Sequence, residues 1–170
     1  MLPQSTPAPV FAETQWFYRR WWWLMLGATA LTLGPLLFAL DKPQGRQAAT
    51  VAGPLLLLVL AGLWLIRLRV RVDAEGIHYQ FTPFLNRWRH WPWREFRQVQ
   101  PRIYSPLGDY GGWGIRGLPG NLAYNVWGQA GLQLVFRSGN RLLLGTQQPE
   151  ELRWVLAALH QVAPTLPITL

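Results

Sequence analysis

The sequence predicts an α+β membrane protein: a two-helix transmembrane hairpin followed by an antiparallel β-sandwich or barrel that a C-terminal helix closes. Residues 21–40 and 48–66 are apolar runs of about 20 residues without a charged side chain, long enough as helices to cross a bilayer core of roughly 30 Å. Beyond residue 66, short runs alternate apolar and polar residues, which is the period of half-buried strands. Helical spacing follows at Leu152, Val155, Leu156 and Leu159.

The distribution of cations predicts the orientation of the hairpin. The outer flanks of the two runs carry five arginines, whereas the connection 41–47 carries only Lys42 and Arg46. The positive-inside rule therefore places both termini on the cytoplasmic side of the inner (cell) membrane. A cleaved signal peptide is the alternative for the first run, but that run is longer than a signal core and a second span follows it closely.

Aromatic residues gather where the two runs meet the expected membrane surface. We expect interfacial anchors at Trp16, Trp21, Trp22, Trp23 and Trp64, because indole rings favour the headgroup level. Neither run contains Asp, Glu, Lys, Arg or His. The absence of intramembrane ionisable groups argues against a channel or a proton-coupled carrier.

The soluble half begins with a β-hairpin, in which residues 68–72 and 77–81 alternate on either side of an Asp-Ala-Glu-Gly turn. Further strands are expected at residues 87–91, 96–104, 122–126, 132–137 and 141–144. The final helix has Pro149 in its first turn and is ended by Pro164 and Pro167. This reading divides the chain into a cytoplasmic or interfacial segment (1–20), the hairpin (21–66), the soluble domain (67–162) and a tail (163–170).

The composition limits the chemistry of the soluble half. The chain contains no cysteine, which excludes disulfides, thiol nucleophiles and cysteine-ligated metals. After residue 66 there are twelve arginines, no lysine and six acidic residues. Arginine suits bidentate contact with phosphate, so anionic lipid headgroups are candidate partners; a merely solubilising surface is the alternative. Three of these arginines alternate on one strand and share a face, which makes them the candidate membrane-surface residues: Arg67, Arg69 and Arg71.

A glycine-rich block at residues 109–117 is the most unusual stretch of the soluble half. As a recognition loop it would use Tyr110, Gly111, Gly112, Trp113, Gly114 and Arg116, with the two aromatic rings as contacts and the arginine for an anionic group. The alternative is a bulged strand whose Trp113 fills the core and whose Arg116 pairs with Asp109 or a carbonyl. The block matches a dinucleotide fingerprint in letters only, because no helix and no acidic residue follow it at the required distance.

Other motifs favour binding over catalysis. Residues 87–94 interleave arginine with tryptophan, which suits either nucleic-acid bases or a bilayer interface, and the membrane tether favours lipid. In the alternative, Trp88 or Trp91 fills the core. The histidines at 78, 90 and 160 are scattered in the sequence, and no catalytic motif is present, so we expect no metal, no cofactor and no enzymatic activity.

Four short motifs carry a resemblance that covers nearly the whole chain: residues 73–77 (DAEGI), 91–93 (WPW), 110–116 (YGGWGIR) and 145–152 (GTQQPEEL). In these the chain resembles a small uncharacterised bacterial family of two-span membrane proteins with a pleckstrin-homology-like (PH-like) cytoplasmic domain. The resemblance implies the fold and the topology, and it leaves the activity open.

The expected function is a non-catalytic, membrane-anchored interaction or scaffold module at the cytoplasmic face. It would bind a protein partner and could contact anionic lipid, with no role for nucleic acid. The alternative is a subunit or assembly factor of a larger membrane complex, and a membrane enzyme is the weakest of the three hypotheses.

Overall fold

The structure is a computed structural model that describes residues 10–39 and 42–170. The predicted end of the first span at Leu40, the first connection residue Asp41 and the first nine residues of the N-terminal segment lie outside the described residues. The described chain forms two compact units. One contains residues 16–66, and the other contains residues 10–15 together with residues 67–170.

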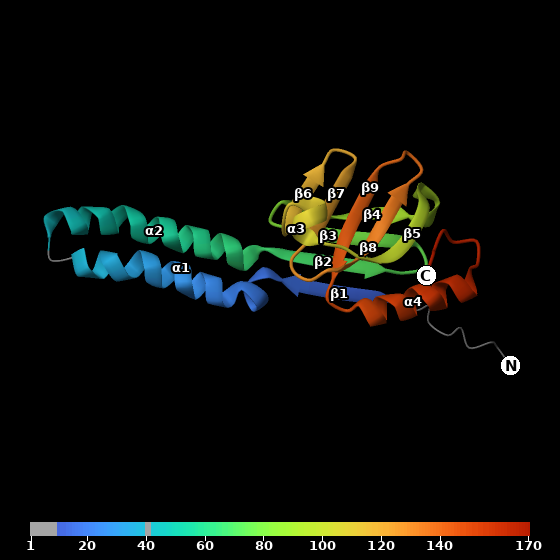
Figure 1. Ribbon diagram of the computed structural model, residues 1–170, viewed down its shortest axis with the longest axis horizontal. Helices are drawn as coiled ribbons and strands as arrows, with labels where there is room; N and C mark the ends of the chain where they lie inside the picture. Colours follow the sequence, from blue (N-terminus) through green and yellow to red (C-terminus); the bar gives the residue numbers. More distant parts are fainter. Residues whose placement is uncertain (1–9, 40–41) are drawn as a thin grey trace. The chain divides into compact units, whose positions relative to one another are not determined.

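The first unit is a helical hairpin of α1 (Phe17–Ala39) and α2 (Pro43–Leu65), shown in Figure 1. The prediction of two long apolar helices is confirmed, and both helices are long and apolar enough to cross a membrane. Each begins four to five residues earlier than predicted. For α2 the reason is Pro43, whose fixed backbone angle suits the first position of a helix. Almost none of the side chains in the apolar stretches of these helices is buried.

The second unit contains two β-sheets. The four-stranded sheet has the order β1 (Phe11–Trp16), β2 (Arg67–Val72), β3 (Gly76–Thr82), β4 (Leu85–Pro92). The five-stranded sheet has the order β5 (Phe96–Ile103), β8 (Ala130–Phe136), β9 (Arg141–Thr146), β7 (Asn121–Asn125), β6 (Gly114–Leu118). A 3₁₀ turn (Trp93–Glu95) joins the sheets, and the short helix α3 (Pro106–Tyr110) precedes β6.

The predicted hairpin of β2 and β3 is confirmed, with Arg67 opposite Thr82 and Val72 opposite Ile77. The prediction of a wholly antiparallel domain is wrong at one pair, because β7 and β9 run parallel. The strand between them in sequence, β8, pairs antiparallel with the other side of β9. That arrangement brings β9 back in the direction of β7.

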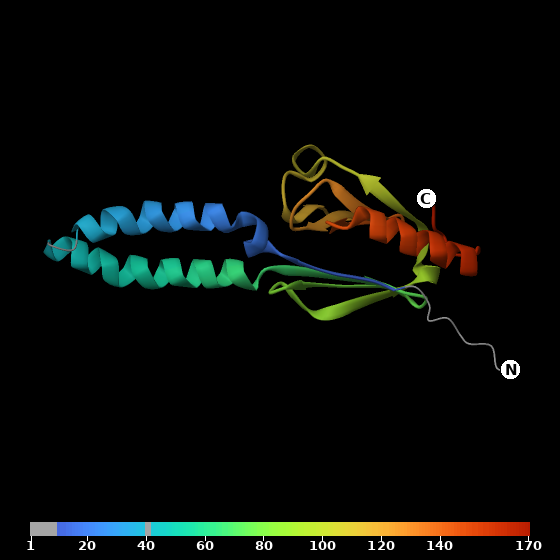
Figure 2. The same ribbon diagram turned by 90° about the horizontal axis from the view of Figure 1, so that it is seen from below.

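The core of this unit lies between the sheets. Inward side chains of β2 and β3 are buried, and the ring of Tyr124 on β7 contacts those of Tyr79 and Phe81 at centroid distances of 5.5 and 6.0 Å. The predicted C-terminal helix is confirmed as α4 (Pro149–Val162), which buries the four residues of its apolar stripe. In Figure 2 the four-stranded sheet forms one layer, and the five-stranded sheet and α4 lie on one side of it.

The tail after α4 returns to the five-stranded sheet. The Val99 amide donates to the Pro167 carbonyl at 2.7 Å, and the Thr169 amide donates to the Val99 carbonyl at 2.8 Å. Ile168 is buried at this bridge. The tail therefore covers part of the free edge of β5, which limits edge-to-edge pairing with other chains.

Strand β1 was not predicted, because residues 11–16 were assigned to the N-terminal segment. Its inward side chains are Phe11, Glu13 and Gln15, all buried. The Thr146 hydroxyl and the Gln147 amide donate to the Glu13 carboxylate at 2.7 and 2.8 Å, and the Gln15 amide donates to the Gly145 carbonyl at 2.6 Å. Strand β1 therefore belongs to the four-stranded sheet and is bonded to the end of β9.

Candidate functional site

The outer face of the four-stranded sheet is the side turned away from the five-stranded sheet. On β2 the arginines at 67, 69 and 71 alternate with the buried residues Leu68, Val70 and Val72. The three predicted membrane-surface arginines therefore do share one face. His78 on β3 lies opposite Arg71 on β2 and opposite His90 on β4. The two histidines therefore share the face of the arginines.

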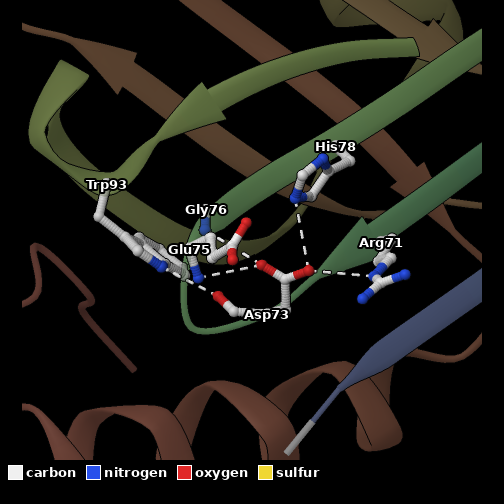
Figure 3. A network of polar contacts seen from close by, with 6 residues as sticks. All are labelled: Arg71, Asp73, Glu75, Gly76, His78 and Trp93. Atoms are coloured by element: carbon white, nitrogen blue, oxygen red, sulfur yellow. Dashed lines mark hydrogen bonds and ion pairs between the residues drawn. The ribbon is translucent and has the colours of Figure 1, made fainter. Parts of the chain in front are cut away.

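Asp73 organises the turn at the end of β2, as Figure 3 shows. One carboxylate oxygen accepts the backbone amides of Glu75 and Gly76 at 3.0 and 3.2 Å. The other lies 3.0 Å from Arg71 Nε and 3.4 Å from His78 Nε2. Both carboxylate oxygens therefore have protein partners.

The environment of Asp73 keeps its carboxylate ionised. Burial alone would raise the pKa, but the Glu75 amide, His78, the Gly76 amide and Arg71 outweigh it and hold the pKa of Asp73 below its ordinary value. The turn is closed by Gly76, where a Cβ would collide with the Trp91 carbonyl of the neighbouring strand. The indole of Trp93, in the 3₁₀ turn directly after β4, donates to the Asp73 carbonyl at 3.0 Å.

His78 and His90 stack with their ring centroids 4.2 Å apart and their planes 13° apart. The two histidines are twelve residues apart in the sequence, which did not predict that they act together, and the register of β3 with β4 brings them side by side. The alternation of residues 87–91 was a usable signal, because a hairpin between 77–81 and 87–91 pairs the two histidines. Among the described residues, no group of three or more His, Asp or Glu side chains could hold a metal ion.

Two adjoining hollows form a groove on the outer face. The larger, of about 750 Å³, is lined by Arg71, Asp73, Glu75, His78 and Trp88 together with apolar residues. The smaller, of about 300 Å³, is lined by Arg69, Arg71, Trp88 and the strand β1. Arg71 and Trp88 line both hollows, and Trp88 remains 49% exposed. Of the two tryptophans considered as core residues, Trp88 is thus a groove residue, whereas Trp91 is half-buried against Phe136 with centroids 5.0 Å apart.

The chemistry of this outer-face groove suits an anion. The Asp73 carboxylate holds Arg71 by its Nε, and the Gln80 side chain accepts from Arg69 Nη1 at 3.5 Å. Each guanidinium is therefore oriented by a neighbour, which favours bidentate anion contact. The lining residues include no serine, cysteine or lysine that His78 could activate as a nucleophile.

The predicted recognition loop is mostly structural. Tyr110 is only 8% exposed and packs edge-on against Tyr104, so it is not an exposed contact. Trp113 is half-buried and stacks on Trp127 with centroids 5.2 Å apart. Arg116 Nε donates to the Trp113 carbonyl at 3.0 Å, which is the carbonyl contact of the alternative interpretation.

The glycines of this block have mixed roles. Gly111 ends α3 with φ of +73°, a left-handed conformation that glycine adopts without strain. Gly112 is buried near the Arg116 side chain, and Gly114 donates its amide to the Asn125 side chain at 2.8 Å as β6 begins. These contacts shape the passage from α3 to β6, while Gly111 and Arg116 remain exposed.

The five predicted interfacial tryptophans lie at one end of the helical hairpin. Tyr18 stacks on Trp64 with centroids 4.7 Å apart, and the Phe17 amide donates to the Ile66 carbonyl at 3.1 Å, so the start of α1 and the end of α2 meet. The rings of Trp16 and Trp21 contact Tyr18 and Phe17, each with centroids 5.6 Å apart. Trp22 and Trp23 are exposed on the same end of α1. This is the arrangement expected of an aromatic belt.

No protein-family model matches this chain, and neither a curated protein nor a solved structure matches it at a significant level.

Proposed function

We propose that this chain is an integral membrane protein, without catalytic activity, whose β domain contacts anionic lipid headgroups through its outer face. The observation that carries the proposal is the single face of Arg67, Arg69 and Arg71 on a strand that begins two residues after the end of α2. A strand rises about 3.3 Å per residue, so all three arginines lie within roughly 20 Å of chain from that helix end.

Membrane insertion is supported by the surface of the helical hairpin. The apolar stretches of α1 and α2 are almost wholly exposed, and such large apolar surfaces require lipid or other protein around them. The aromatic belt at the end of the hairpin agrees with a membrane boundary there. The cytoplasmic location of that end remains our inference from the positive-inside rule.

The energetics are those of a charged surface facing headgroups. Each arginine near an anionic leaflet contributes about 1 kcal/mol, so three give about 3 kcal/mol, which salt weakens. We also propose a PH-like fold for this domain, on the strength of two sheets with a C-terminal helix packed into their core.

The test uses the full chain in lipid nanodiscs. The protein has no cysteine, so a single fluorophore can be attached at Thr14→Cys. Thr14 is an exposed position of β1 and lies beside the arginines. We expect anionic nanodiscs to shield this fluorophore from an aqueous quencher more than zwitterionic nanodiscs do. Reversal of Arg67, Arg69 and Arg71 to Glu should abolish the difference, as should high salt.

The matched control reverses three exposed arginines elsewhere, Arg94, Arg97 and Arg153, which changes the net charge equally. This control should keep the shielding. Equal shielding on both lipids, or equal loss in both charge-reversed variants, would contradict the proposal.

A subunit or assembly factor of a larger membrane complex is the second candidate. A Cβ placed on any of the four membrane-helix glycines (Gly27, Gly34, Gly53 and Gly62) would meet nothing within 4 Å. These small residues are thus free to pack against other helices, as small residues often do in membranes. A particle larger than one copy plus detergent, with a stoichiometric second protein, would favour this candidate.

A further inference from the structure

We infer that the outer-face groove is a binding site for a phosphomonoester lipid headgroup, and that protonation of the stacked pair His78 and His90 switches it on. This inference rests on the proposed function, because it names the headgroup and the condition under which the same face binds it. It is built on the contacts around Asp73, the stacking of the two histidines and the position of Trp88.

The charges of the groove explain why a switch is needed. The lining residues hold two arginines, Arg69 and Arg71, against three acidic residues, Asp73, Glu75 and Glu13, so their formal charge is −1 while the histidines are neutral. The Glu13 carboxylate accepts from Thr146 and Gln147. Protons on His78 and on His90, which stacks on it, add two positive charges, so the sum becomes +1 and the attraction for an anion grows.

The surroundings of His78 decide how its two charge states fit the groove. Histidine as a residue type changes charge between about pH 5 and pH 8. The charged or titratable groups facing His78 are Arg71 on β2, His90 on β4, and the turn carboxylates of Asp73 and Glu75. Because Asp73 stays ionised at 3.4 Å from His78 Nε2, a protonated His78 keeps a counter-charge on one side.

A phosphomonoester fits this groove better than a phosphodiester does. It carries up to two negative charges and three terminal oxygens, where a diester carries one charge and two. Arg69 and Arg71 stand two residues apart on one strand, about 7 Å, so a phosphate between them can contact both. The exposed Trp88 ring lines both hollows and offers an apolar wall for the carbons of the headgroup.

The test compares phosphatidate, a phosphomonoester lipid, with phosphatidylglycerol, a phosphodiester lipid, at matched surface charge. The full chain is reconstituted in nanodiscs with one fluorophore at Ala12→Cys, on the β1 wall of the smaller hollow. Below about pH 6.5 we expect a preference for phosphatidate on the order of tenfold, the effect of an added charge-assisted contact. The preference should be lost near pH 8.

Three variants separate the effect of the groove on binding from the effect of protonating the lipid. Phosphatidate itself takes up a proton near pH 6, so His78→Gln with His90→Gln measures that contribution on the same lipid. These changes should remove the preference and leave the general contact with anionic lipid. His78→Lys should preserve the preference at pH 8, because the lysine stays charged. Trp88→Ala should reduce the preference at every pH.

Each outcome decides one question. Equal responses to the two anionic lipids would overturn this inference and leave the proposed function standing, whereas no response to either would overturn both. A preference that ignores pH or survives the double histidine variant would overturn the switch. A full response to inorganic phosphate over zwitterionic nanodiscs would make free phosphate the ligand and overturn the lipid assignment.

Discussion

At the scale of single residues, Asp73 is the side chain on which the turn between β2 and β3 depends. It is 11% exposed, and its loss would leave the amides of Glu75 and Gly76 without acceptors and Arg71 without its counter-charge. We expect Asp73→Ala to lower the free energy of unfolding by about 1–3 kcal/mol, and Asp73→Asn by less, because an amide oxygen still accepts a backbone bond. Denaturant unfolding of the detergent-solubilised chain measures both, and equal losses would contradict this account.

The acid dependence of Asp73 has a definite sign. Its folded pKa lies below the ordinary value of 3.8, so the ionised carboxylate stabilises the fold at every pH above about 4. That contribution is lost as the pH falls below this range. The stability gap between wild type and Asp73→Asn should therefore close in acid, and a gap that widens there would refute the assignment.

Glu13 behaves in the opposite way. Burial raises its pKa above the ordinary value of 4.5, although Thr146 and Gln147 donate to it. The folded state thus prefers the protonated form of Glu13. Its contribution to the free energy of unfolding is fully present below about pH 4.5 and is lost as the pH rises through the folded pKa. We expect wild type to lose stability relative to Glu13→Gln between pH 4.5 and neutrality. Melting temperatures of the two proteins across this range check it, and a constant difference would exclude the effect.

At the scale of elements, the sequence predicted those whose pattern is local. The hairpin of β2 and β3 alternates buried apolar residues with polar ones, and α4 repeats them at helical spacing, so both periods are visible in a short window. Strand β1 was not predicted, because two of its inward positions are the polar residues Glu13 and Gln15. Their partners lie 130 or more residues away, at Gly145 and beyond. Strand β6 overlaps the block 109–117, for which a bulged strand was the alternative interpretation; its sequence, GIRGL, is poor in strand-forming residues, and it pairs with β7.

The candidate site, like the elements, was predictable from the sequence where its contacts are local. The shared face of the three arginines follows from alternation along one strand, and the contacts of Asp73 with Arg71, Glu75 and Gly76 lie within three residues of it in the predicted turn. The stacked histidines depend on the register between β3 and β4. The buried position of Tyr110 depends on Tyr104, which precedes the short helix α3; the sequence analysis did not predict this helix.

The role of β1 as an edge strand of the unit that holds both β-sheets gives a prediction at this scale. Phe11 is fully buried, so Phe11→Ala should cost about 3–5 kcal/mol of unfolding free energy. Its neighbour Val10 is 46% exposed, and Val10→Ala should change stability by no more than about 0.5 kcal/mol. Denaturant titration of the full chain separates the two. Similar values for both variants would mean that β1 is not packed as the structure has it.

At the scale of the whole molecule, the order of the four-stranded sheet constrains how the chain can cross a membrane. Strand β1 precedes α1 and strand β2 follows α2, yet the two strands are neighbours in one sheet. Strands of one sheet lie on the same side of a bilayer. A chain that leaves at β1 and returns at β2 must therefore cross an even number of times, and two helices of sufficient length stand between them.

This constraint predicts which positions share a side of the membrane, independently of the lipid bound. Single cysteines at Thr14 on β1 and at Ser138 between β8 and β9, both exposed, should react with an impermeant maleimide from the same side, whereas Gln44 at the start of α2 should react from the other. If the shared side is cytoplasmic, as the positive-inside rule predicts, only Gln44→Cys should be labelled in intact cells. Labelling in inverted vesicles supplies the converse control. If Thr14→Cys and Ser138→Cys reacted from opposite sides, β1 and β2 could not be neighbours in a sheet, and the contact of the arginine face with headgroups would lose its structural basis.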